Sequence, residues 1–281
     1  MTAESILLEL REVSITYDAG SPSVRRALRA VNLRVGTGDR VGLMGRAGSG
    51  KTTLLHVLAG LRTPDSGKLL GKEKLLPSLV FQFPEHQLFA ETVALDVAYG
   101  LRAHGVPQEA VRSRVETALL DVGLEPAEFA SRAPFHLSGG EKRRVALAGA
   151  LAQRRGIVLF DEPTLGLDFD GITRLSAILE RMHESGTAYW LASHDADFVA
   201  ATCSQLVVLD AGSVAFQGPA DDFWSEPGLA DACGVRLPRE AALARVLERC
   251  GVEGLPARPD VHRIAEALLA LWQKPKTPGG T

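Results

Sequence analysis

The first forty residues carry an alternation of apolar and polar positions that predicts strands. Residues 6–16 alternate imperfectly, whereas residues 31–35 alternate strictly. The turn-rich stretch Asp18–Ser23 lies between them. A period of two is the pattern of a β-strand, because successive side chains point to opposite faces of a sheet. We therefore expect two strands separated by a turn at the start of the chain.

Short, largely apolar runs separated by helical patterns predict a parallel sheet further along. Strands are predicted at 41–44, 79–82, 157–160, 188–191 and 206–209. The first of these leads through a glycine-rich loop into a predicted helix at 51–60, with Leu54, Leu55 and Leu58 on its apolar face. Alternation of strands and helices with such runs is typical of an α/β fold whose sheet is covered on both faces.

The middle and the end of the chain are predicted to be helical. Between about 91 and 154, apolar residues recur at spacings of three and four, as at Val111, Val115 and Leu119. After about Pro227 two further helices are predicted, at 238–250 and 261–272. The predicted divisions are a main domain at 1–226 with a helical subdomain inserted at about 84–154, a helical extension at 227–273 and a disordered tail at 274–281.

The composition is that of an ordinary globular protein, with 46% hydrophobic and 23% charged residues. The net charge of −3 offers no strong basic field for nucleic acid. Three scattered cysteines form no pairing pattern, which favours a reducing compartment. The longest uncharged stretch, 198–209, is too short to span a bilayer, and Met1–Glu4 lacks the basic start of a signal peptide. We expect a soluble, cytoplasmic protein that is free to bind a membrane partner.

One motif indicates a phosphate-binding loop between the first buried strand and the helix after it. The pattern GxxxxGK[ST] is matched by Gly45, Arg46, Ala47, Gly48, Ser49, Gly50, Lys51 and Thr52, and Thr53 follows. Glycines let backbone N–H groups point into one concavity, and the helix N-terminus adds positive potential. Lys51 can reach the β- and γ-phosphates, and the Thr52 hydroxyl can bind Mg²⁺. The alternative is an ordinary glycine-rich turn before a helix.

Two acids close the predicted strand at 157–160. Buried charges are costly unless they are paired or bound to metal, and the carboxyl end of a parallel strand faces the ligand crevice. Asp161 would then hold Mg²⁺, directly or through water, and Glu162 would accept a hydrogen bond from the attacking water. Without the phosphate loop upstream, a solvated strand end would be the better interpretation.

A second glycine pair precedes a long predicted helix near Lys142. Ser138 and Glu141 have the S-x-x-E spacing of a capping box, in which each satisfies a backbone donor of the other. Between them, Gly139 and Gly140 expose backbone N–H groups at a positive helix end, which makes a second anion site in one chain. One ATP has no obvious need for both sites.

In combination these motifs resemble the ATP-binding subunits of ABC transporters. The residues that fall in that family's order, over about residues 4 to 225, are Lys51, Gln82, Ser138, Asp161, Asp168 and His194. The resemblance implies a P-loop NTPase core with an antiparallel β edge and an inserted helical subdomain. It also implies that ATP and Mg²⁺ are cofactors. Two ATP molecules would be sandwiched in a head-to-tail dimer, in which the LSGG loop faces the phosphate loop of the other subunit.

The resemblance also implies roles for single residues. Gln82 would be the Q-loop residue that senses Mg²⁺ and the attacking water. Asp168 would belong to the D-loop at the dimer interface, and His194 would contact the γ-phosphate. Tyr17 would stack on adenine, although by itself it is better explained by plain strand packing.

Within that family the chain is similar to the ATPases of energy-coupling factor importers, which take up vitamins, cobalt and nickel. The similarity lies in residues 80–89, in residues 141–149 and in the helices beyond Pro227. It implies three partners: a second ATPase subunit (a second copy or a paralogue), a transmembrane coupling subunit and a substrate-binding membrane subunit. The protein would then lie on the cytoplasmic face of the membrane.

Two departures from the family pattern and two alternative functions stay open. The signature carries Glu141 where Gln is usual, so a second carboxylate either weakens that half of the site or only caps the helix. The segment 67–78 is short and shows no clear pair of strands. The alternatives are a soluble ABC ATPase with a non-transport role and a degenerate nucleotide-binding module without hydrolysis.

Three large apolar residues lie close behind Gln82: Phe83, Leu88 and Phe89. They are predicted either to pack the helical insert onto the core or to line a groove for a helix of the membrane subunit.

Overall fold

The computed structural model describes residues 6–18, 24–71, 77–83, 87–226, 228–252, 254–256 and 258–273. Most of the predicted turn at 18–23 and the whole predicted tail at 274–281 lie outside these residues. The strands are β1 (Ile6–Tyr17), β2 (Arg25–Gly36), β3 (Arg40–Met44), β4 (Ser66–Gly71), β5 (Ser78–Val80), β6 (Ile157–Asp161), β7 (Ala188–Ala192), β8 (Gln205–Asp210) and β9 (Ser213–Pro219).

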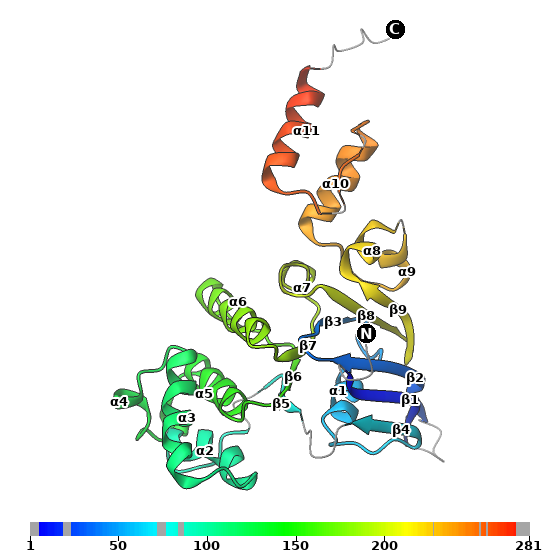
Figure 1. The fold of residues 1–281 in the computed structure, drawn as a ribbon. Helices are drawn as coiled ribbons and strands as arrows, with labels where there is room; N and C mark the ends of the chain where they lie inside the picture. Colours follow the sequence, from blue (N-terminus) through cyan, green and yellow to red (C-terminus); the bar gives the residue numbers. More distant parts are fainter. Residues whose placement is uncertain are drawn as a thin grey trace, which may run out of the picture.

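The helices fall into a core set, an inserted set and a C-terminal set (Figure 1). The core set is α1 (Lys51–Leu58), α6 (Phe169–Glu184) and α7 (Ala196–Thr202). The inserted set is α2 (Val93–Ala103), α3 (Gln108–Asp121), α4 (Pro126–Phe129), the 3₁₀ turn η3 (Pro134–His136) and α5 (Gly139–Ala152). The C-terminal set is α8 (Ala220–Ser225), α9 (Leu229–Ala232), α10 (Arg239–Arg249) and α11 (Val261–Gln273).

A six-stranded sheet forms the centre, in the order β5-β6-β7-β3-β8-β9. The first five strands pair in parallel, and β9 returns antiparallel to β8. Alternate residues of the parallel strands enter two different cores: Leu159 packs with α1 and the antiparallel sheet, whereas Phe160 packs with the inserted helices. This burial on both faces confirms the α/β prediction and explains why the strands are continuously apolar.

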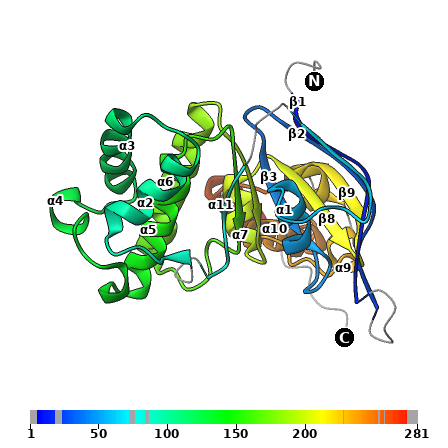
Figure 2. The ribbon, with the colours of Figure 1, turned by 90° about the horizontal axis from the view of Figure 1, so that it is seen from below.

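A separate antiparallel sheet has the order β2-β1-β4 and lies across the molecule from the inserted helices (Figure 2). In β1 and β2 the buried residues alternate, so that Leu10 pairs with Leu33 and Val13 with Val31. The short segment 67–78 does contribute here, because Leu69 of β4 pairs with Leu10 of β1. Among the described residues, a segment with no strand pattern of its own therefore supplies one strand, β4, of the antiparallel edge.

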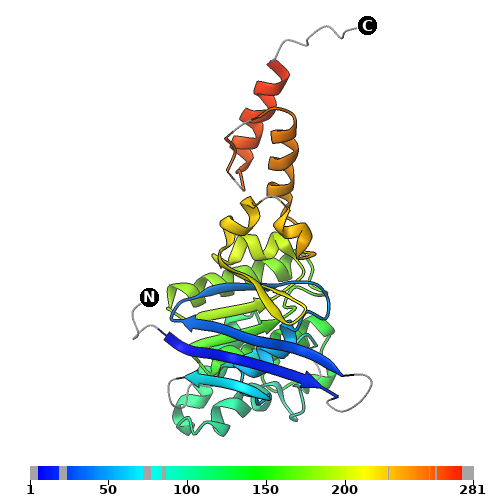
Figure 3. The same ribbon diagram turned by 90° about the vertical axis from the view of Figure 1, so that its right-hand side faces the viewer.

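The inserted helices α2 to α5 pack on one another beside the sheet, between β5 and β6 in the sequence (Figure 2). Val97, Val115 and Ala148 of this set are buried in the same core as Phe160. The helices α10 and α11 project away from the rest of the molecule (Figure 3). The strand β9 and the helices α8 and α9 have no counterpart in the sequence-based prediction.

Candidate functional site

The loop at residues 45–50 requires glycine for reasons of space and backbone geometry. Gly45 and Gly50 have φ values of 136° and 109°, which L side chains rarely adopt. A Cβ on Gly45 would overlap the carbonyl oxygen of Leu209, and one on Gly50 would overlap that of Ala27. The loop is therefore held against β2 and β8 at the N-terminus of α1, the position at which a helix favours an anion.

Lys51 lies buried inside this loop. Its Nζ donates to the carbonyl oxygens of Gly45 (2.9 Å) and Arg46 (3.1 Å). Burial lowers the pKa of the ammonium group, and the charges of Glu162 and Asp161 oppose that shift. The loop thus holds a cation beside the N-terminus of α1, and a charged donor of this kind suits phosphate binding.

Thr52 and Asp161 bring two oxygen groups together at the end of β6. The Thr52 hydroxyl donates to Asp161 Oδ2 at 2.8 Å, and the carboxylate is buried. Hydroxyl and carboxylate oxygens are the ligands that Mg²⁺ prefers, with waters and phosphates completing the shell. Among the described residues no three His, Cys, Asp or Glu side chains form a metal cluster. The pair therefore fits a partly solvated Mg²⁺ site and not an all-protein metal cage.

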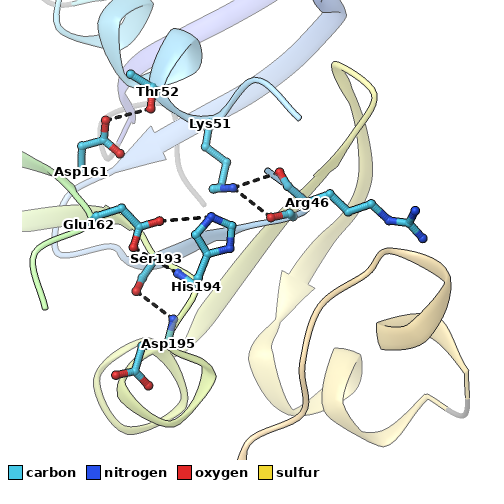
Figure 4. A network of polar contacts seen from close by, with 9 residues as sticks. Arg46, Lys51, Thr52, Asp161, Glu162, Ser193, His194 and Asp195 are labelled. Carbon is cyan, nitrogen blue, oxygen red and sulfur yellow. Dashed lines mark hydrogen bonds and ion pairs between the residues drawn. The ribbon is translucent and has the colours of Figure 1, made fainter. Parts of the chain in front are cut away.

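Glu162 and His194 form a second polar pair beside Lys51 (Figure 4). The distance from His194 Nε2 to Glu162 Oε1 is 3.4 Å, and the His194 amide lies 3.3 Å from Glu162 Oε2. Glu162 adopts a left-handed φ of 49°, and its amide donates to Ala192 of the neighbouring strand. This backbone turn directs the carboxylate out of the strand toward the loop, at a strain that often accompanies functional sites.

The Glu162 carboxyl group has an environment suited to a base. Burial raises its pKa, while His194 and Lys51 lower it and Asp161 adds to the increase. Only 15% of its side chain is exposed, against 55% for His194. A carboxylate with a raised pKa takes up a proton more readily than an exposed glutamate does.

Tyr17 lies at the end of β1, near the start of α1. Its hydroxyl is 3.4 Å from Thr53 Oγ1, and the Arg62 guanidinium stacks 5.3 Å from the ring centroid. The ring is partly exposed.

Gln82 does not lie in the strand predicted for it, because β5 ends at Val80. Its carbonyl accepts a hydrogen bond from Arg143 (3.1 Å), which ties the segment to the inserted helix α5. No hydrogen bond among the described residues joins its side-chain amide to Thr52 or Asp161.

The predicted capping box at α5 is confirmed. Glu141 N donates to Ser138 Oγ (3.3 Å), and Ser138 N donates to Glu141 Oε2 (2.7 Å). These hydrogen bonds lower the pKa of Glu141, so its carboxylate is occupied with the helix end. A Cβ on Gly139 or Gly140 would meet nothing within 4 Å, which leaves their backbone open to the outside.

Asp168, which the resemblance assigns to the D-loop, acts as a helix cap in this chain. Its Oδ1 accepts from the amide of Gly171 at 2.8 Å, at the start of α6. Within the described residues, no hydrogen bond joins Asp168 or Ser138 to the loop at 45–52. The loop, Thr52, Asp161, Glu162 and His194 therefore meet within one chain, whereas Ser138 and Asp168 line a cavity with Glu162 and, in the part of the chain that the structure describes, make no hydrogen bond to the loop.

Two arginine side chains make contacts at the phosphate loop that the sequence did not indicate. Arg25 of β2 donates to the carbonyl of Gly48 (2.8 Å), and Arg46 donates to the carbonyl of Ala232 (3.2 Å). Only the strand register could have indicated Arg25, which pairs with Tyr17 across the antiparallel sheet. The Arg46 contact joins residues 186 positions apart and carries no local signal.

None of the helices in the described part of the chain is both long and apolar enough to cross a bilayer.

Comparison with known proteins finds relatives that all belong to the ABC transporter ATPases. A family model described as ABC transporter matches residues 28–165. The energy-coupling factor transporter ATP-binding protein EcfA2 of Caldanaerobacter subterraneus subsp. tengcongensis is 36% identical over 92% of this chain and 94% of its own. EcfA of Methanothermobacter thermautotrophicus is also 36% identical, over 88% of this chain and 82% of its own.

Solved structures agree with these relatives. The structure of cbiO1 from Clostridium perfringens, part of the ABC transporter complex cbiONQ, has a TM-score of 0.69 and 30% identity. It covers 86% of this chain and all of its own. A dimeric ATP-binding cassette, MJ0796, bound to ADP and phosphate, has a TM-score of 0.66 and 28% identity, over 76% and 98%.

These likenesses confirm the P-loop NTPase fold and the family that the motifs indicate. With the loop, the two acids and the histidine assembled as described, the chain belongs to the family of energy-coupling factor transporter ATP-binding proteins, a branch of the ABC transporter ATPases.

Proposed function

We propose that this chain hydrolyses Mg-ATP in a dimer of ATPase subunits and thereby powers an energy-coupling factor importer. The observation that carries the proposal is the adjacency of two pairs at the end of β6. Thr52 and Asp161 are 2.8 Å apart, and Glu162 lies 3.4 Å from His194. Oxygen ligands for a metal and a buried base with its histidine therefore stand next to a phosphate loop.

Binding of the nucleotide is assigned to the loop at 45–53 and to Tyr17. The backbone N–H groups and Lys51 hold the phosphates, and the partly exposed ring of Tyr17 stacks on adenine. Thr52 and Asp161 would hold Mg²⁺, which when bound supplies charge neutralisation for the phosphate oxygens.

Activation of water is assigned to Glu162. Its carboxylate accepts a proton from water that is aligned with the γ-phosphate, and burial favours the protonated product. His194, held against Glu162, contacts the γ-phosphate. Gln82 reports the state of the site to the inserted helices, because its carbonyl is already bound to Arg143 of α5.

A second subunit is required for the other half of the site. The backbone of Ser138, Gly139 and Gly140 is exposed at the positive end of α5 and is open for an anion. In a head-to-tail dimer it would complete the ATP site of the partner, with Asp168 beside the interface. Exposed apolar residues of the C-terminal helices would add a contact that needs no nucleotide: Leu243, Val246, Leu268, Leu269 and Trp272.

The membrane partner is assigned to the surface next to Gln82. Leu88 is buried and packs the insert onto the core, whereas Phe89 is 59% exposed. The rings of Phe89 and Tyr99 meet edge to face at 4.8 Å, and Asp96 Oδ2 accepts from the amide of Phe89. An ordered apolar pair of this kind suits an apolar helix of a transmembrane coupling subunit.

The protein would then lie on the cytoplasmic face of the membrane, and a separate membrane subunit would select the substrate, a vitamin or a transition-metal ion.

The test of hydrolysis is Glu162→Gln, measured as steady-state ATPase activity beside the dissociation constant for ATP. Removal of a general base lowers turnover by about 10² to 10⁴-fold, and binding should be kept because Lys51 and Thr52 are unchanged. Glu184→Gln, at an exposed position of α6, is the matched control and should retain full activity. Turnover of Glu162→Gln at the rate of the wild type would refute the assignment.

A further inference from the structure

The side chain of Arg46 leaves the phosphate loop to which its backbone belongs. The carbonyl of Arg46 accepts from Lys51 Nζ and from the amide of Ser49, both at 3.1 Å. Its guanidinium points away from Lys51 and Glu162 (Figure 4). The group instead donates to the carbonyl of Ala232 in α9, at 3.2 Å. One residue therefore contacts both the cation of the loop and the segment that leads to the C-terminal helices.

The side chain of Arg46 also packs against the backbone of Gly234. Its φ of 63° is left-handed, and its amide closes the turn after α9 by donating to Asp231. A Cβ at this position would overlap Arg46 Nε and would lie 2.6 Å from Arg46 Cγ. The stem of Arg46 thus lies flat on the backbone at 234, and only glycine leaves it that room.

The segment at 229–235 is itself anchored, so it can transmit a constraint. Ala230, Cys233 and Val235 are buried in the core that also holds the inserted helices. Four residues further on, Arg239 at the start of α10 is tied to Asp197 of α7 through its amide (2.7 Å) and its side chain (3.1 Å). The path from the phosphate loop to α10 is therefore short and packed.

We propose that Arg46 is a positioning residue that couples the phosphate loop to the C-terminal extension, through its contacts with Ala232 and Gly234. Nucleotide binding at 45–52 then orders the segment 229–235, and docking of that segment strengthens nucleotide binding by the same factor, because linkage is reciprocal. The inference rests on the proposed function, since it needs the loop to bind a nucleotide.

The chain offers a matched pair of glycines for the test. Gly234→Ala and Gly228→Ala both put a Cβ on a left-handed residue, at φ 63° and 80°. Only the first meets Arg46, because a Cβ on Gly228 has nothing within 4 Å. The difference between the two variants isolates the Arg46 contact from the cost of the backbone conformation.

The experiment measures the dissociation constant of Mg-ADP by titration calorimetry and the amide hydrogen exchange of 229–249, on the full-length protein. In the wild type, Mg-ADP should slow exchange in 229–235. Arg46→Met and Gly234→Ala should each raise the dissociation constant about threefold to tenfold, the range of one typical hydrogen bond, and should remove that protection. Gly228→Ala should keep both. In Arg46→Met and in Gly234→Ala, the KM for ATP should rise while kcat stays near that of the wild type.

Non-additivity separates positioning from a merely structural effect. Because both substitutions break one contact, Arg46→Met combined with Gly234→Ala should weaken binding no more than either alone. Melting temperatures identify any variant that fails to fold. If Gly234→Ala does not fold, the protection by Mg-ADP measured in Arg46→Met tests the inference instead.

Two outcomes would overturn the inference. One is that Gly234→Ala has the same dissociation constant for Mg-ADP and the same amide protection as Gly228→Ala. The other is that Mg-ADP binds to the wild type without slowing hydrogen exchange in 229–235. A wild type that does not bind Mg-ADP would instead refute the proposed function.

Discussion

The helices α1 and α5 both have glycines at their N-termini, and these two N-termini have opposite surroundings. At α1, Gly45 and Gly50 have left-handed φ values, and a Cβ on either would overlap a carbonyl of the chain itself. At α5, Gly139 and Gly140 have no positive φ, are exposed, and would accept a Cβ without any contact within 4 Å. Packing within the chain therefore requires glycine at the N-terminus of α1 and does not require it at the N-terminus of α5.

The difference indicates where each ligand comes from. The α1 terminus already holds a cation of its own, Lys51, and has Thr52 bonded to Asp161. The α5 terminus satisfies its first donors with Glu141 and leaves the glycine backbone free of bulk. An exposed backbone without side-chain bulk suits the close approach of an anion from outside, as the proposed head-to-tail dimer requires.

Among the substitutions at the two termini, the largest expected effect on hydrolysis comes from Gly140→Asp, which puts bulk and negative charge at the exposed N-terminus of α5. ATP hydrolysis should fall by about 10² to 10³-fold, as when a preorganised donor to a developing charge is lost. The melting temperature and the ATP affinity of the isolated chain should stay unchanged, because no atom of the chain is in the way. Ser113→Asp, exposed on α3, carries the same charge as a control. Normal hydrolysis by Gly140→Asp would remove α5 from the composite site.

Gly45→Ala should give the reverse pattern. The Cβ collides with Leu209 at a φ of 136°, so the folded state itself is strained. We expect the free energy of unfolding to fall by about 1–3 kcal/mol and nucleotide binding to be lost with it. Chemical denaturation and Mg-ADP titration measure the two effects. If the variant unfolds like the wild type, the contrast between the two termini is wrong.

The pH dependence of turnover tests whether the base belongs to the α1 side. Because burial raises the pKa of Glu162, kcat at saturating Mg-ATP should decline as the pH falls through that raised value. The decline should begin at higher pH than the titration of an exposed glutamate, near about 4.3. In Glu162→Gln the residual turnover should lack this acid limb. An acid limb that persists in the variant would assign it to another group.

The smallest effect on the isolated chain is expected from Phe89→Asp. Phe89 lies outside both helix termini, so basal hydrolysis should stay within about twofold of the wild type. Co-purification with the membrane subunits and transport should fall strongly, since an apolar anchor is often worth about 2 kcal/mol or more. Leu61→Asp, equally exposed near the end of α1, is the control. Normal assembly of a folded Phe89→Asp protein would remove this residue from the coupling surface.

Much of the site could be predicted because its chemistry is local. The residues 45–52 are contiguous, and the strand 157–160 ends in its two acids whatever else surrounds it. The capping box at Ser138 was likewise readable from a spacing of three residues, and the structure bears it out. The roles assigned to these residues remain predictions, which the variants above would test.

Other parts depended on pairing that no local pattern encodes. The strand β4 has only one half-buried leucine, Leu69, and exists because β1 offers it a partner. The exposed alternation of β9 gives little signal, and its partner β8 decides it. Gln82 was placed in a strand because apolar residues precede it, but pairing with β6 ends at Val80.

By itself, then, the sequence determined the fold class, the phosphate loop and the identity of the acids, since period and motif act over a few residues. Only the tertiary structure decided which distant groups meet: His194 with Glu162 and Arg46 with Ala232. The physical reason is that such contacts depend on strand order and on the space that packing leaves. The glycines of the two helix termini are a further example, because the sequence places glycines at both. Only the packed chain shows that Gly45 and Gly50 lie against carbonyl groups of the chain itself, whereas Gly139 and Gly140 have no such neighbours.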